Sequence, residues 1–76
     1  MKYGIEIYTI NKEGKESEHK MVVRSDSHAE CIKEMKEIRH MFSHTNEILC
    51  GSTEKVSFYM DGELVVYQLV RPEEEG

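Results

Sequence analysis

The sequence contains few residues that form covalent cross-links, and it has no tryptophan. Among its 76 residues are two cysteines, Cys31 and Cys50, and one proline. Two cysteines are too few to hold together a small secreted domain of the disulfide-rich class. The sequence therefore predicts a cytoplasmic protein in which both thiols are reduced.

Basic residues are also scarce relative to acidic ones. The chain has 10 Lys and Arg against 15 Asp and Glu, which gives a formal net charge of −5. Affinity for phosphate backbones needs clustered cations, so this balance argues against direct nucleic-acid binding. It is compatible with binding to a basic surface, and it is equally typical of small soluble domains of any role.

Long apolar runs are absent as well. No run approaches 18 residues, and no basic-then-apolar segment follows Met1. We therefore expect neither a membrane span nor a secretory signal, and no membrane partner. A chain this short buries only about 60% of its unfolded surface, so marginal stability is expected unless a partner or a second copy helps.

The sequence does contain strand-like segments and one helical stretch. Segments rich in β-branched and aromatic residues lie at residues 3–10, 18–24, 56–60 and 64–70. Only residues 28–44 have helical periodicity. This order predicts an α+β domain, β-β-α-β-β, with one four-stranded antiparallel sheet and a single helix packed on one face. The domain is expected to span residues 1–71, followed by a disordered acidic tail at 72–76.

The first two strands can be aligned through a predicted turn. Lys12, Glu13 and Gly14 form a three-residue loop in which Gly14 takes the left-handed conformation. The resulting register places three pairs on an apolar face: Ile7–His19, Ile5–Met21 and Tyr3–Val23. Two pairs lie on the polar face: Glu6–Lys20 and Tyr8–Glu18.

A second hairpin is predicted at Asp61-Gly62, a dipeptide typical of two-residue turns with positive φ. It pairs Met60 with Glu63, Phe58 with Val65 and Val56 with Tyr67. The other face of this hairpin carries Tyr59, Leu64, Val66, Gln68 and Val70.

This second face is apolar. A single helix covers only one side of a sheet, so the helix leaves this face uncovered. Tyr59, Leu64 and Val66 therefore predict an apolar patch that serves as a homodimer interface or a partner interface. The alternative is that strand curvature or the tail hides these residues.

The helix is predicted to begin with a capping box, in which Ser27 accepts from a backbone N–H and Glu30 reaches back to Ser27. Its apolar stripe and the strands predict a core of Ile5, Ile7, Met21, Val23, Ile32, Met35, Ile38, Phe42, Val56, Phe58 and Val65. Loss of the Phe42 side chain is expected to cost about 3–5 kcal/mol. Residues 45–54 are expected to return to the sheet as a loop, with Ile48 and Leu49 closing one end of the core.

Two residue pairs have the spacing of metal ligands: His40 with His44, and His28 with Cys31. The pairs lie about 18 Å apart along the helix and point to different sides of it, so they do not form one site. A tetrahedral zinc site needs three or four converging ligands, and no C-x-x-C motif is present. No catalytic motif or phosphate-binding glycine loop occurs either. We therefore expect no enzyme activity, no cofactor and no metal; a small enzyme or metal protein using His40 and His44 is the weakest alternative.

The element order, the short acidic chain and the helix entry Ser25-Asp26-Ser27-His28-Ala29-Glu30 together resemble small phage-encoded inhibitors of the anti-CRISPR type. The resemblance covers the outline of the chain and no specific motif. It implies a protein without an active site that binds a host nucleic-acid machine, in the host cytoplasm, through surface charge and an exposed sheet.

The sequence and this resemblance predict a non-enzymatic acidic binding module that inhibits a host nucleic-acid-processing complex. Its partner would be a host protein or ribonucleoprotein with a basic surface, and Glu30, Glu34 and Glu37 would occupy a groove meant for nucleic acid. Tyr59, Leu64 and Val66 would supply the apolar part of the interface. The alternative is a housekeeping or structural homodimer without inhibitory activity.

Overall fold

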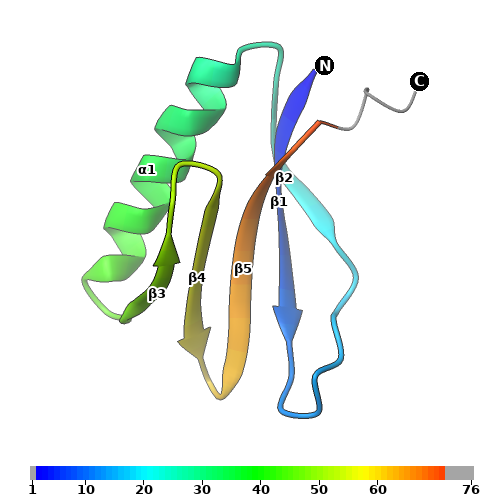
Figure 1. The fold of residues 1–76 in the computed structure, drawn as a ribbon, viewed down its shortest axis with the longest axis vertical. Helices are drawn as coiled ribbons and strands as arrows, with labels where there is room; N and C mark the ends of the chain where they lie inside the picture. Colours follow the sequence, from blue (N-terminus) through cyan, green and yellow to red (C-terminus); the bar gives the residue numbers. More distant parts are fainter. Residues whose placement is uncertain (1, 72–76) are drawn as a thin grey trace.

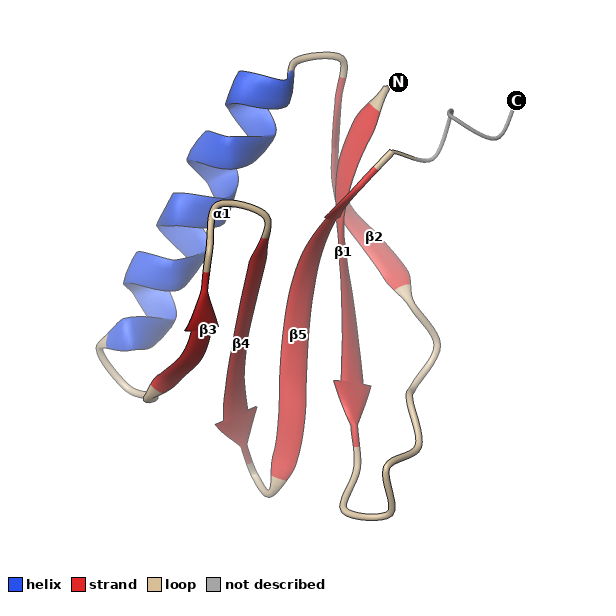
Figure 2. Cartoon of the chain, viewed as in Figure 1, coloured by secondary structure: helices blue, strands red, loops and turns tan. Residues whose placement is uncertain are grey.

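Five strands form one antiparallel sheet, and one helix packs across one face of it (Figures 1 and 2). The structure is a computed structural model that describes residues 2–71. Its elements are β1 (Tyr3–Ile10), β2 (Lys20–Ser25), α1 (His28–Ser43), β3 (Ile48–Gly51), β4 (Lys55–Met60) and β5 (Glu63–Val70). The strand order is β2-β1-β5-β4-β3. The first and the last strand of the chain, β1 and β5, are therefore neighbours inside the sheet.

The predicted α+β class, the single helix and the β-β-α-β-β order are confirmed, but the sheet has five strands and not four. The additional strand, β3, lies inside the segment predicted to be a loop. Ile48 pairs with Phe58, whereas Cys50 pairs with Ser57, so a register shift falls between them and Leu49 is 51% exposed. A four-residue strand with such a shift shows no regular alternation, which is why the sequence pattern does not reveal it. The predicted tail at 72–76 lies outside the described residues.

The second hairpin has the predicted register. Met60 pairs with Glu63, Phe58 with Val65 and Val56 with Tyr67. Asp61 and Gly62 have φ values of 53° and 82°, as a two-residue turn with both central residues left-handed requires.

The first hairpin has the predicted turn but not the predicted register. Gly14 has a φ of 83° and donates its N–H to the carbonyl oxygen of Asn11, and Ile10 then pairs with Glu16 as expected. Beyond that point β2 begins only at Lys20. The observed pairs are Ile7–Lys20, Glu6–Met21, Ile5–Val23 and Tyr3–Ser25, with a register shift between Ile5 and Glu6.

These shifts move two side chains to the face opposite the one predicted. Met21 pairs with Glu6, and a side chain at Gly4 would collide with the Met21 sulfur, so Met21 lies on the helix-free face and not in the core. His19 likewise lies over Tyr8 and not beside Ile7. The physical reason is that each extra residue in one strand reverses the side-chain alternation beyond it.

The core lies between α1 and the sheet. Its buried members are Ile5, Cys31, Met35, Ile38, Val56, Phe58 and Val65, with Tyr3, Ile7, Val23, Phe42, Ile48, Tyr67 and Leu69 packed around them. The Phe42 ring stacks on Phe58 with 4.4 Å between ring centroids, which confirms the predicted core-facing side of the helix. Of the predicted core residues, Met21 and Ile32 lie outside this cluster.

Only half of the predicted capping box is present. The Ser27 side chain accepts a hydrogen bond from the Glu30 N–H at 3.3 Å. The Ser27 N–H donates to Ser25 Oγ at 3.0 Å, and that hydroxyl donates to the Glu30 carboxylate at 3.4 Å. Ser25 therefore stands between the two groups that were expected to bond directly, and it ties the end of β2 to the start of α1.

Candidate functional site

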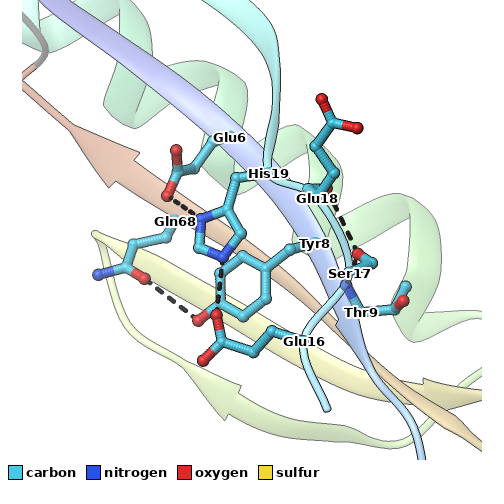
Figure 3. A network of polar contacts seen from close by, with 8 residues as sticks. All are labelled: Glu6, Tyr8, Thr9, Glu16, Ser17, Glu18, His19 and Gln68. Carbon is cyan, nitrogen blue, oxygen red and sulfur yellow. Dashed lines mark hydrogen bonds and ion pairs between the residues drawn. The ribbon is translucent and has the colours of Figure 1, made fainter.

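The middle of the helix-free face is closed by its own side chains. Tyr8 and Ser57 both pair with Val66, so all three lie on this face. Their exposed fractions are nevertheless only 9%, 6% and 1% for Tyr8, Ser57 and Val66. Tyr8 is covered from outside by His19, whose ring lies flat on the Tyr8 ring with 3.9 Å between ring centroids and an interplanar angle of 4° (Figure 3).

This closure reduces the predicted apolar patch. Val66 is buried, Leu64 is half-buried, and Tyr59 keeps 59% of its surface exposed. Strand pairing does place Tyr59 beside Leu64 on this face, as expected. Of the three predicted patch residues, only Tyr59, near the Asp61-Gly62 turn, keeps most of its surface exposed, so the three do not form a continuous exposed patch.

The polar contacts over Tyr8 form a group that we call the His19 cluster: Glu6, Tyr8, Glu16, His19 and Gln68 (Figure 3). His19 Nδ1 lies 2.9 Å from a Glu6 carboxylate oxygen, and His19 Nε2 lies 2.8 Å from a Glu16 carboxylate oxygen. The Tyr8 hydroxyl donates a long hydrogen bond of 3.5 Å to the Gln68 side-chain oxygen. The cluster thus joins β1, β5 and the segment that precedes β2.

The irregular segment before β2 explains how His19 reaches this position. The Ser17 N–H donates to the Thr9 carbonyl oxygen at 2.8 Å, and the Thr9 N–H donates to Ser17 Oγ at 2.8 Å. A side-chain hydroxyl thus replaces a backbone acceptor in the ladder, which is how serine commonly competes with regular pairing. The chain leaves the sheet at this point, and the His19 ring is placed over Tyr8.

The electrostatics of the cluster favour the charged form of His19. Both ring nitrogens face carboxylates, and only the imidazolium can donate from both nitrogens at once. The hydrogen bonds to Glu16 and then to Glu6 raise the pKa of His19 above its ordinary value. Burial, and then the nearby charges of Glu16 and Glu6, raise the pKa of the Tyr8 hydroxyl, so this phenol stays protonated.

The contacts of the cluster give it a structural role. In the imidazolium form both His19 nitrogens donate to carboxylates, so in that form neither has a lone pair to accept a proton or to bind a metal. The side chain is 38% exposed, so solvent screens these ion pairs. We conclude that the cluster holds the segment before β2 against β1 and covers the middle of the sheet.

A second surface lies on α1. Glu30, Glu34 and Glu37, together called the acidic face, follow an i, i+4, i+7 spacing and therefore lie on one side of the helix. Glu30 and Glu37 are exposed and Glu34 is half-buried. Within residues 2–71 no ion pair engages Glu34 or Glu37, and Glu30 accepts only from Ser25.

Sequence reasoning missed one exposed apolar residue beside the acidic face. Met41 follows Glu37 by four residues, which extends the same side of the helix, and it is 58% exposed. The spacing alone could have identified it. This side of α1 thus presents three carboxylates and one flexible thioether, and exposed Lys33 and Lys36 lie on the neighbouring part of the helix surface.

The two thiols differ in their exposure. Cys31 is buried, Cys50 is half-buried, and both are free. Burial, followed by the charges of Glu30 and Glu34, raises the pKa of the Cys31 thiol, so it stays protonated as a core side chain. Within the described part of the chain, no three His, Cys, Asp or Glu side chains converge on a metal site.

A hollow of about 280 Å³ lies between the two hairpin turns, which reach the same end of the sheet (Figure 1). Lys12, Glu13, Asp61 and Glu63 contribute charges of both signs to its lining. It is open to solvent and holds no converging set of donors.

No helix between residues 2 and 71 is long and apolar enough to cross a membrane. Comparison with protein families, with curated proteins and with solved structures finds no significant match for the chain.

Proposed function

We propose that this protein is a non-enzymatic binding module that occupies the nucleic-acid-binding surface of a host protein or ribonucleoprotein complex. This is the mode of action implied by its resemblance in outline to inhibitors of the anti-CRISPR type. The observation that carries the proposal is the acidic face, where Glu34 and Glu37 are free of ion pairs within residues 2–71.

The spacing of the acidic face supports this proposal. A helix rises about 1.5 Å per residue, so Glu30 and Glu37 are separated by about 10.5 Å along the axis, with a charge about every 5 Å. One strand of DNA carries a phosphate about every 3.4 Å along its axis. The acidic face thus carries its charges in a line that is more widely spaced than the phosphates of a DNA strand, and we propose that this line enters the same basic groove.

Two exposed apolar side chains suit the final, desolvated complex, one beside the acidic face and one on the opposite face of the sheet. Met41 lies on the same side of α1 and is exposed, and a flexible thioether adapts to varied surfaces. Tyr59 is a second exposed anchor, on the helix-free face beside the half-buried Leu64. We propose that the carboxylates steer the encounter and that these apolar side chains contribute to the bound state.

The experiment is affinity capture from host lysate with the wild-type protein, followed by elution with duplex DNA. If the acidic face occupies a nucleic-acid site, DNA releases the captured complex. The triple variant Glu30→Lys, Glu34→Lys, Glu37→Lys is expected to lose capture. Association of the wild type is expected to weaken steeply with salt, because exposed charges are screened beyond about 8–10 Å at moderate ionic strength.

A matched control separates the acidic face from net charge. The variant Glu13→Lys, Glu18→Lys, Glu47→Lys changes the charge by the same amount at exposed positions away from the outer side of α1. Capture by this control is expected to match the wild type. Equal capture by both triple variants, with no dependence on salt, contradicts the proposal.

The homodimer alternative is tested by sedimentation of the purified protein and of the Leu64→Glu variant. A wild-type dimer that the substitution converts to a monomer, in a protein that captures no DNA-releasable complex, would favour the structural homodimer over the inhibitor. The substitution is suitable because Leu64 lies beside Tyr59 at the exposed end of the sheet.

A further inference from the structure

The last turn of α1 brings two histidines together. His40 lies in this turn and His44 is the C-terminal cap of the helix. Both are exposed, and their Nε2 atoms are 3.4 Å apart. The ring centroids are 4.7 Å apart and the rings are nearly perpendicular, at 79°.

This separation fits chelation as well as it fits a long hydrogen bond. Imidazole nitrogens bind zinc at about 2.0–2.1 Å, so two of them at a tetrahedral angle are about 3.3–3.4 Å apart. Hydrogen bonds from N–H donors have their commonest length at about 2.9–3.0 Å. The observed 3.4 Å between the Nε2 atoms is long for a hydrogen bond and equals the chelating distance.

The position on the helix also favours a cation. The unpaired carbonyl groups at a helix C-terminus carry partial negative charge, which stabilises positive charge in the last turn. Residues four apart on a helix face the same way, so the two imidazoles need little reorganisation to bind one ion.

The other histidines of the chain offer no comparable pair. Both His19 nitrogens are held by carboxylates. His28 Nε2 is buried without a hydrogen-bond partner among the described residues, and its ring packs against Tyr3. Within the described part of the chain, His40 and His44 are thus the two neighbouring histidines that are both exposed and not held by carboxylates.

We propose that His40 and His44 form a two-histidine chelate for a late first-row transition-metal ion such as Zn²⁺. Imidazole is a ligand that suits Zn, Ni and Cu. No third protein ligand converges here among residues 2–71, so two coordination positions are left to water or to a ligand from another molecule. The site is an exchangeable metal contact on the surface of the helix and is independent of the proposed function.

The test is calorimetric titration of the purified protein with ZnCl₂, in a Cys50→Ser background that removes the accessible thiol. His40→Ala and His44→Ala are each expected to weaken binding at least tenfold. The double variant is expected to be no weaker than either single variant, because losing one ligand already abolishes chelation. ZnCl₂ is also expected to raise the Tm of the parent and not of these variants, since chelation requires the folded helix.

A relocated pair provides the control. Lys36 is exposed and four residues before His40, so Lys36→His in the His44→Ala chain rebuilds the spacing one turn earlier. This variant is expected to recover binding, and His19→Gln is expected to leave binding unchanged. Single-variant losses that simply add in the double variant, or affinity equal in all variants, would overturn the proposal.

Discussion

Val66 provides the sharpest test of how the helix-free face is closed. It lies on the side of the sheet that no helix covers, yet it is 1% exposed because the neighbouring side chains, Tyr8 among them, cover it. Truncation to alanine removes two buried carbon groups from a site that solvent does not reach. If the face is closed as the structure shows, Val66→Ala behaves as a core substitution.

The expected magnitude follows from that burial. Two methylene equivalents at about 0.8 kcal/mol each give about 1.6 kcal/mol of lost transfer free energy. The cavity left beneath Tyr8 increases the cost to roughly 2–3 kcal/mol, because the surroundings relax only in part. For a domain of this size the Tm should fall by about 8–24 °C, since each kcal/mol is worth about 4–8 °C.

The measurement is urea unfolding followed by circular dichroism, with Val22→Ala as the matched control. Val22 lies on the edge strand β2 and is 50% exposed, so its truncation makes the same change of side chain within a strand but removes much less buried surface. We expect the control to lose less than about 1 kcal/mol. Equal destabilisation by the two variants would refute the reasoning and would mean that Val66 is open to solvent.

Three further predictions concern His19, Ser27 and Gly62. The pKa of His19 is raised in the folded state. The contribution of charged His19 to folding stability is therefore fully present below its ordinary pKa of 6.5 and is lost as pH rises through the folded pKa. The stability gap between wild type and His19→Gln, measured by urea unfolding, should thus be larger at about pH 5.5 than at about pH 8.5; a constant gap would contradict this. Ser27→Ala should cost about 1 kcal/mol through the lost helix cap and Ser27→Gly only a few tenths, so equal thermal midpoints for the two would count against capping. Gly62 has a φ of 82°, so Gly62→Ala should cost roughly 1–2 kcal/mol while Gly62→Asn is better tolerated, and a neutral alanine variant in chemical denaturation would show that the turn rearranges.

The second hairpin and the helix could be predicted from the sequence because their signals are local. Asp61-Gly62 permits only a narrow set of turns, and a two-residue turn fixes the pairing of every residue that follows. The apolar spacing along α1 likewise identifies the buried side of the helix without reference to its partners. The same spacing places the three glutamates of the acidic face on one side of α1.

The first hairpin and β3 show where local signals are insufficient. A register shift adds one residue and leaves the composition unchanged, yet it moves every later side chain to the other face. Whether the shift occurs depends on contacts between distant residues, such as His19 on Tyr8 and the Thr9–Ser17 hydrogen bonds. The sequence predicted Met21 in the core for this reason, and the His19 cluster was not predicted at all.

The sequence by itself determined the class of fold, the turn chemistry, the buried side of the helix and the line of carboxylates, since each depends on neighbours within one turn or one hairpin. Only the tertiary structure decided that five strands form the sheet, that Val66 is covered, and that the His19 ring lies on Tyr8. These features depend on the packing of side chains from separate segments. Packing is a property of the whole chain, because each close contact is selected by the volume and charge that all the other segments leave available.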